Sequence, residues 1–102
     1  MKNLQQRQKV LLVSKTDVTG SQEIPGAKLT ILDTDDQVIE SWVSGTEPHY
    51  IEKLPIGQYT LREEKASEGY VMVNDVMFEI ADTAEIQKVT MENATAKGKI
   101  LI

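Results

Sequence analysis

The chain has 102 residues, a formal net charge of −5, one histidine and no cysteine. The length suits a single domain with a modest core. The absence of cysteine allows no disulfide, and a single histidine without cysteine argues against a zinc site. Scattered Lys and Arg argue against nucleic acid as a partner, and the absence of a long apolar run argues against membrane insertion.

Residues 1–9 are polar and lack the apolar stretch of a signal peptide, so we interpret them as a leader or linker. Beyond them, turn signals such as Pro25-Gly26 separate short runs in which apolar residues alternate with polar ones. No long segment has helical periodicity. Strands are predicted at about 9–16, 27–33, 37–43, 48–53, 57–64, 75–80 and 86–93. This pattern is typical of an all-β sandwich or barrel.

Three of these strands carry one polar residue on an otherwise apolar face. Alternate residues of a strand share a face, and the polar residues concerned are Lys15, Glu63 and Asn93. Glu64 belongs to the opposite face and is expected in water. Lys, Glu and Asn are rarely buried without a partner. Each could instead be an ordinary residue: a strand-end lysine that reaches water, a carboxylate paired at the surface, or an asparagine that ends its strand. The other possibility is that the three side chains meet in the core. The faces are Leu11, Val13 and Lys15; Tyr59, Leu61 and Glu63; and Val89, Met91 and Asn93.

Such a meeting would have a chemical consequence. Burial favours the neutral forms of both an amine and a carboxylic acid, so Lys15 could act as a nucleophile toward the side-chain amide of Asn93. A protonated Glu63 could donate a hydrogen bond to the amide carbonyl and pass protons from the amine to the departing nitrogen. The product would be a Lys–Asn isopeptide bond, with ammonia released. Because the reaction happens once, the protein would not be an enzyme in the usual sense.

The same segments resemble the B-type repeat domain of Gram-positive collagen adhesins, the Cna B-type fold that many sortase-assembled pilins share. The resemblance covers residues 10–93 and rests on "VSKTDVTG", "IPGAKLTILD", "LPIGQYTLREEKASEGY" and "VTMEN". It places the reactive lysine at Lys15, the catalytic acid at Glu63 and the acceptor at Asn93. Two residues depart from the family pattern: Glu64 stands where Thr is common, and Ser67 where Pro is common.

The resemblance implies an Ig-like or prealbumin-like antiparallel β-sandwich, here residues 10–94. It also implies a role as a stalk or adhesin module on the cell wall, outside the cell, with neighbouring repeat domains as partners. The tail "KGKILI" resembles the opening strand of a following repeat, so residues 95–102 are either that strand or an additional strand of this domain. We expect an isolated domain to be monomeric.

Other interpretations remain. The fold could serve as an adhesin module that binds a host extracellular-matrix protein, or it could be a plain β-sandwich without a cross-link. Lys9 is an alternative to Lys15 as the reactive lysine, because it shares a face with Leu11, but it lies nearer the polar leader. Asn74 or Asp75 could replace Asn93 as the acceptor of the isopeptide bond, but "NDV" is typical of a turn. Acidic pairs such as Asp35-Asp36 lack the oxygen spacing of a calcium loop, so we expect no metal and no cofactor.

Overall fold

Seven strands and no helix make up the described part of the chain. The structure, a computed structural model, describes residues 8–18, 20 and 22–94. Every predicted strand is present, with ends shifted by at most two residues. The interpretations of residues 1–7 and 95–102 lie outside the described residues. The strands are β1 (Gln8–Asp17), β2 (Lys28–Leu32), β3 (Val38–Val43), β4 (His49–Pro55), β5 (Gly57–Lys65), β6 (Val76–Ile80) and β7 (Gln87–Asn93).

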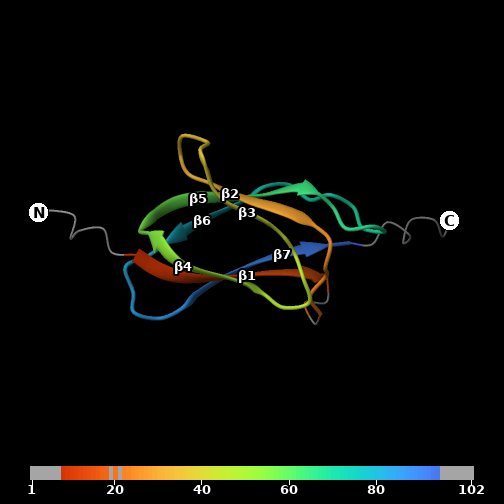
Figure 1. Ribbon diagram of the computed structural model, residues 1–102, viewed down its shortest axis with the longest axis horizontal. Helices are drawn as coiled ribbons and strands as arrows, with labels where there is room; N and C mark the ends of the chain where they lie inside the picture. The colour runs from red at the N-terminus through yellow and green to blue at the C-terminus, as the bar shows by residue number, and fades with distance from the viewer. Residues whose placement is uncertain (1–7, 19, 21, 95–102) are drawn as a thin grey trace, which may run out of the picture.

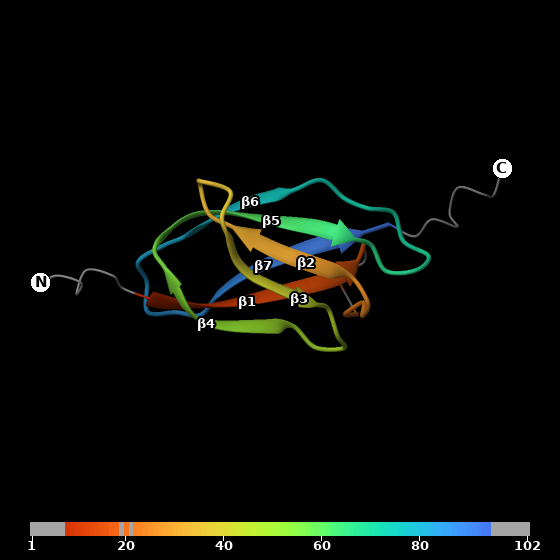
Figure 2. The ribbon, with the colours of Figure 1, turned by 45° about the horizontal axis from the view of Figure 1, so that its top comes forward.

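The strands form two sheets that face each other as a sandwich (Figures 1 and 2). One sheet has the order β4-β1-β7 and the other the order β3-β2-β5-β6. All pairs are antiparallel except β1 and β7, which run parallel. The predicted all-β sandwich of seven strands is therefore confirmed, with four antiparallel pairs and one parallel pair. Parallel neighbours need a long crossover connection, and here all the other strands lie between β1 and β7 in the chain.

The apolar faces of the strands meet between the two sheets. Alternation is clear in β5, where Tyr59, Leu61 and Glu63 are buried while Glu64 is exposed, as the sequence predicts. The inner strand β2 is buried on both faces from Leu29 to Leu32. The buried cluster comprises Leu11, Val13, Ala27, Leu29, Ile31, Ile51, Leu54, Tyr59, Leu61, Ile80 and Met91.

One flank of the sandwich is joined by an aromatic contact. Trp42 of β3 stacks on His49 of β4, with ring centroids 4.1 Å apart. The His49 Nε2 atom also lies 2.9 Å from a carboxylate oxygen of Glu40. Because β3 and β4 belong to different sheets, these contacts tie the edges of the two sheets together.

β1 and β7 run in the same direction along the sandwich. Figure 1 shows β1 beginning at one end and β7 finishing at the other, close to where β1 and β5 also finish and β2 begins. The loop before β2 and the loop after β5 therefore lie at the same end as Asn93, the last residue of β7.

Truncating a core residue should cost far more stability than truncating an exposed one in the neighbouring strand. Leu61 is fully buried, so Leu61→Ala should lower the free energy of unfolding by about 2–5 kcal/mol. Met77 of β6 is 77% exposed, and Met77→Ala should change it by less than about 0.5 kcal/mol. Urea denaturation measures both values, and equal losses would contradict this account of the core.

Candidate functional site

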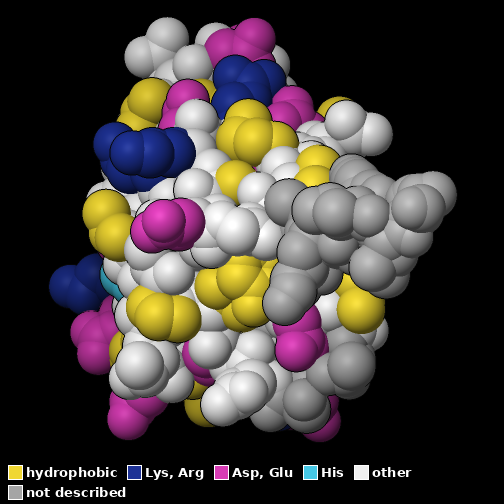
Figure 3. Space-filling model, turned by 90° about the vertical axis from the view of Figure 1, so that its right-hand side faces the viewer, with side chains coloured by type: hydrophobic (Ala, Val, Ile, Leu, Met, Phe, Trp, Pro, Cys, Tyr) yellow, Lys and Arg dark blue, Asp and Glu magenta, His cyan; other side chains and the backbone are white. Residues whose placement is uncertain are grey.

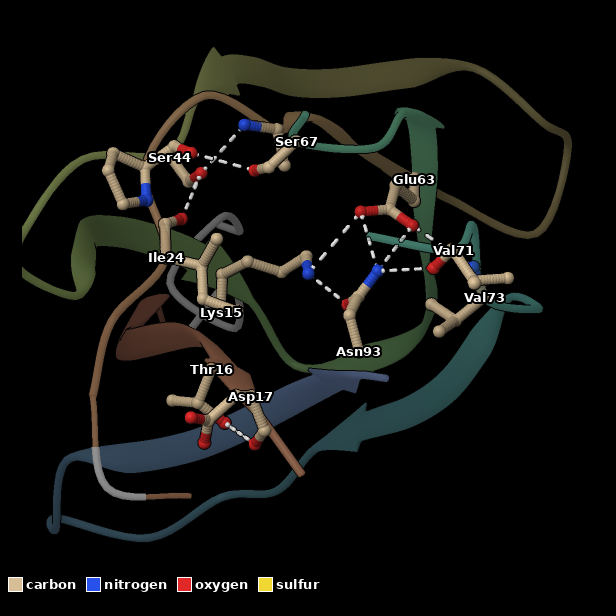
Figure 4. A network of polar contacts seen from close by, with 12 residues as sticks. Lys15, Thr16, Asp17, Ile24, Ser44, Glu63, Ser67, Val71, Val73 and Asn93 are labelled. Atoms are coloured by element: carbon tan, nitrogen blue, oxygen red, sulfur yellow. Dashed lines mark hydrogen bonds and ion pairs between the residues drawn. The ribbon is translucent and has the colours of Figure 1, made fainter. Parts of the chain in front are cut away.

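Lys15, Glu63 and Asn93 lie together in the core. Lys15 comes from β1 and Asn93 from β7 in one sheet, while Glu63 comes from β5 in the other. Their exposed fractions are 1%, 0% and 3% for Lys15, Asn93 and Glu63, respectively. Figure 4 shows the three side chains pointing toward one another between the sheets. The site therefore spans the interior of the sandwich.

The pairing of β1 with β7 explains why a long side chain is needed. Lys15 lies opposite Met91, and Asn93 lies opposite Asp17. Residues two apart on a strand share a face, so Lys15 and Asn93 both point inward but are offset along the strand direction. The four-carbon stem of Lys15 spans that offset.

An amine, an amide and a carboxyl group are in mutual contact at the site. The Lys15 Nζ atom donates a hydrogen bond to Asn93 Oδ1 and lies 3.3 Å from Glu63 Oε2. The Asn93 Nδ2 atom donates to both Glu63 oxygens, at 3.0 and 3.1 Å. The carboxyl group thus contacts the amine nitrogen and the amide nitrogen at once.

The segment after β5 fixes the orientation of the amide. The Asn93 Nδ2 atom also donates to the carbonyl oxygen of Val71 at 2.8 Å, which a flipped amide could not do. The backbone N–H of Val73 donates to Glu63 Oε1 at 3.0 Å. From the sequence, Glu63 is predicted to donate a hydrogen bond to the side-chain carbonyl of Asn93. The structure instead places the carboxyl group against the amide nitrogen, because the carbonyl oxygen is turned toward Lys15.

Burial lowers the pKa of the Lys15 amine from its ordinary value of 10.5, because the charged ammonium loses its hydration. The negative charge of Glu63 and its hydrogen bond to the amine act in the opposite direction but do not cancel the effect. The environment therefore favours the neutral, nucleophilic form of the amine more than water does.

The other candidate residues lie elsewhere. Lys9 is six residues before Lys15, about 20 Å along the strand, and its amine pairs with Asp82 at 3.1 Å. Asp75 accepts two hydrogen bonds from the half-buried Arg62, and Asn74 is exposed. Within the described residues there is no cluster of His, Cys, Asp and Glu able to hold a metal ion. The described part of the chain also contains no apolar helix of membrane-spanning length.

Two serines, Ser44 and Ser67, fix the loop before β2 by hydrogen bonds. Their connection to the site was not predicted from the sequence. Ser44 donates from its hydroxyl to the carbonyl of Ile24 at 2.7 Å and accepts from the N–H of Ala27 at 2.9 Å. Ser67 donates to the carbonyl of Pro25 at 2.7 Å. Ser67 is one of the two departures from the family pattern, and this contact across 42 residues of sequence fastens the loop after β5 to the loop before β2.

The comparisons with known proteins agree with this architecture. A family model described as "SpaA: Prealbumin-like fold domain" matches residues 9–95. The solved structure of the Bacillus anthracis TIE protein is 28% identical, with a TM-score of 0.73 over 86% of this chain. The pilus 2b backbone protein of group B streptococcus and BcpA, the major pilin subunit of Bacillus cereus, are each 19% identical. Their TM-scores are 0.75 and 0.74, over 92% and 87% of this chain.

This chain is similar to only part of each of these larger proteins. It covers 17% of the Bacillus anthracis protein, 43% of the streptococcal protein and 30% of BcpA. No curated protein matches the sequence. The two pilin structures share the fold of this chain, while the family match covers nearly all of the described residues.

Proposed function

This chain belongs to the SpaA prealbumin-like fold domain family, and from that premise we propose that it is a structural module that cross-links itself through an isopeptide bond between Lys15 and Asn93. One observation carries the proposal. Three polar side chains, each at most 3% exposed, make mutual contacts between the two sheets, at the end of the sandwich where β1 and β7 finish.

The proposed reaction exchanges one amide for another. The neutral Lys15 Nζ attacks Asn93 Cγ, and the new N–C bond forms as the Cγ–Nδ2 bond breaks. Glu63 takes a proton from the attacking amine and delivers it to Nδ2, which leaves as ammonia. The contacts of Glu63 with both nitrogens support this proton path. Contact within the folded core supplies the effective concentration that free amines and amides lack.

We propose that the domain, residues 10–94, forms part of a pilus or adhesin stalk on the surface of a Gram-positive cell. The fold shared with a pilus backbone protein and a major pilin subunit supports this role, and so does the small share of each of them that the chain covers. Neighbouring domains of a longer, wall-anchored chain would be its partners. A host matrix protein is a further candidate partner.

The cross-link should be visible by mass. The intact protein should weigh one ammonia less than its sequence predicts. Trypsin does not cleave after a modified lysine, so a digest should contain a branched peptide that joins residues 10–28 to residues 89–97. Mass spectrometry checks both. A full sequence mass, with the two peptides found separately, would contradict the proposal.

Replacing Glu63 should block formation of the isopeptide bond, whereas replacing its sequence neighbour Glu64 should not. Glu63→Gln keeps the size of the side chain but cannot shuttle the proton, so the variant should fold and retain its full mass. Glu64 is exposed, so Glu64→Ala should still lose ammonia. Intact mass spectrometry of the two variants decides, and cross-linking in Glu63→Gln at the rate of the parent would exclude the proposed role.

Loss of the bond should lower thermal stability. The bond would close a segment of 78 residues, which by the chain-entropy relation for disulfides stabilises the fold by about 4–5 kcal/mol. We therefore expect Asn93→Ala and Lys15→Met to lower the Tm by more than about 10 °C. Differential scanning calorimetry in reducing buffer measures the change, since an amide resists reduction.

Lys15→Met is the better of these two variants for separating the bond from packing, because methionine keeps much of the buried chain. If Lys15→Met melted within a degree or two of the cross-linked parent, the bond would make no contribution to stability.

A further inference from the structure

β1 extends beyond the end of its neighbour β4. The pairing of β1 with β4 finishes at Val13 and His49, while β1 continues to Asp17. On this side Lys15 therefore lies next to no regular strand. Its backbone groups are buried with it, and a buried N–H or C=O without a hydrogen-bond partner destabilises the fold.

Glu23 and Ile24 lie beside β1 where β4 has ended, next to Lys15 and Thr16. The backbone N–H of Ile24 donates to the carbonyl of Lys15 at 2.7 Å. The backbone N–H of Lys15 donates to the side-chain Oε1 of Glu23 at 3.1 Å. A single bridge between Thr16 and Glu23 completes the contact. Both backbone groups of the reactive lysine are therefore held by this short segment, one of them by a side chain.

The segment is itself fixed, and it borders solvent. Ser44 and Ser67 hold it through Ile24 and Pro25. On its other side is a surface cleft of about 970 Å³, which residues 23–26 line together with Lys65 to Glu68. Figure 3 shows this end of the sandwich, where hydrophobic and charged side chains are interspersed on the visible face. The segment thus contacts the Lys15 backbone and also lines the cleft.

We propose that Glu23 is a positioning residue for the isopeptide reaction: by accepting the Lys15 backbone N–H, it fixes the position from which the lysine side chain reaches Asn93. This inference rests on the proposed function. An attack on an amide requires the reacting atoms to be about 3–3.5 Å apart, and a displacement of about 1 Å can slow such a step about a hundredfold. Glu23 acts through its hydrogen bond to the backbone N–H of Lys15.

The test follows the loss of ammonia with time. The full chain and its variants are isolated in urea after brief synthesis, before the bond has formed, and diluted into buffer. Intact mass gives the rate of cross-linking, and circular dichroism monitors folding in parallel. Glu23→Ala should react at least about tenfold more slowly than the parent. Glu23→Gln should restore the rate, because its amide oxygen can still accept the Lys15 N–H. Glu68→Ala, at the same end, should match the parent.

Two further outcomes separate positioning from other roles. The midpoint of the pH–rate profile reports the titration of the amine, so it should be the same for Glu23→Gln and the parent. Equal rates for Glu23→Ala and the parent, slow reaction of both Glu23 variants, or a shifted midpoint would overturn this inference while the bond itself still formed. If Glu23→Ala did not fold, Glu23→Met would replace it, because methionine keeps the side-chain length but has no oxygen to accept the Lys15 N–H; a parent rate for Glu23→Met would overturn the inference. A parent chain that kept its full mass would overturn the proposed function, and the inference with it.

Discussion

The burial of the Lys15 side chain is the constraint on which the rest of the site depends. An ammonium group in an apolar core loses its hydration, and the protein must pair it or favour its neutral form. Glu63 and the Asn93 carbonyl supply polar contacts from both sheets. Val71 and Val73 then satisfy the remaining hydrogen-bonding groups of Asn93 and Glu63. Among the described residues, no buried side-chain nitrogen or oxygen lacks a partner. The network is complete, and it places the Lys15 amine against the side-chain amide of Asn93.

The parallel pairing of β1 and β7, the first and last strands, determines how a pulling force would act on this network. β1 begins at one end of the sandwich and β7 finishes at the other (Figure 1), so a pull on both would shear the ladder between them. In the proposed cross-linked state, the load would pass from β1 through Lys15 to Asn93. The residues between them, including most of the core, would lie outside the covalent path. A stalk module must stay folded under tension, and this arrangement of strands suits that role.

The sequence predicts the strands and their faces well because both are local properties. Period-2 alternation placed Glu63 in the core and Glu64 in water, as found, and it put Lys15 and Asn93 on inward faces. It could not predict the parallel pairing of β1 with β7, since alternation says which face is buried but not which strand is adjacent. The orientation of the Asn93 amide is set by Val71, 22 residues away. The contact of Glu23 with the Lys15 backbone depends on where β4 ends. Such long-range contacts leave no periodic signal.

The proposed reaction would also remove an unfavourable feature of the fold, the burial of an ionisable amine in the core. Before it, the core contains an amine whose protonated form is disfavoured by burial and a carboxyl group close to it. After it, the amine has become part of a neutral amide, whose N–H can donate to Glu63. Departure of ammonia removes a reactant, so the reverse step would need ammonia to return to a closed core. The unfavourable free energy of burying the Lys15 amine would therefore destabilise the fold only until the bond forms. A structural module can accept a costly buried lysine on these terms, because that cost falls on a transient state.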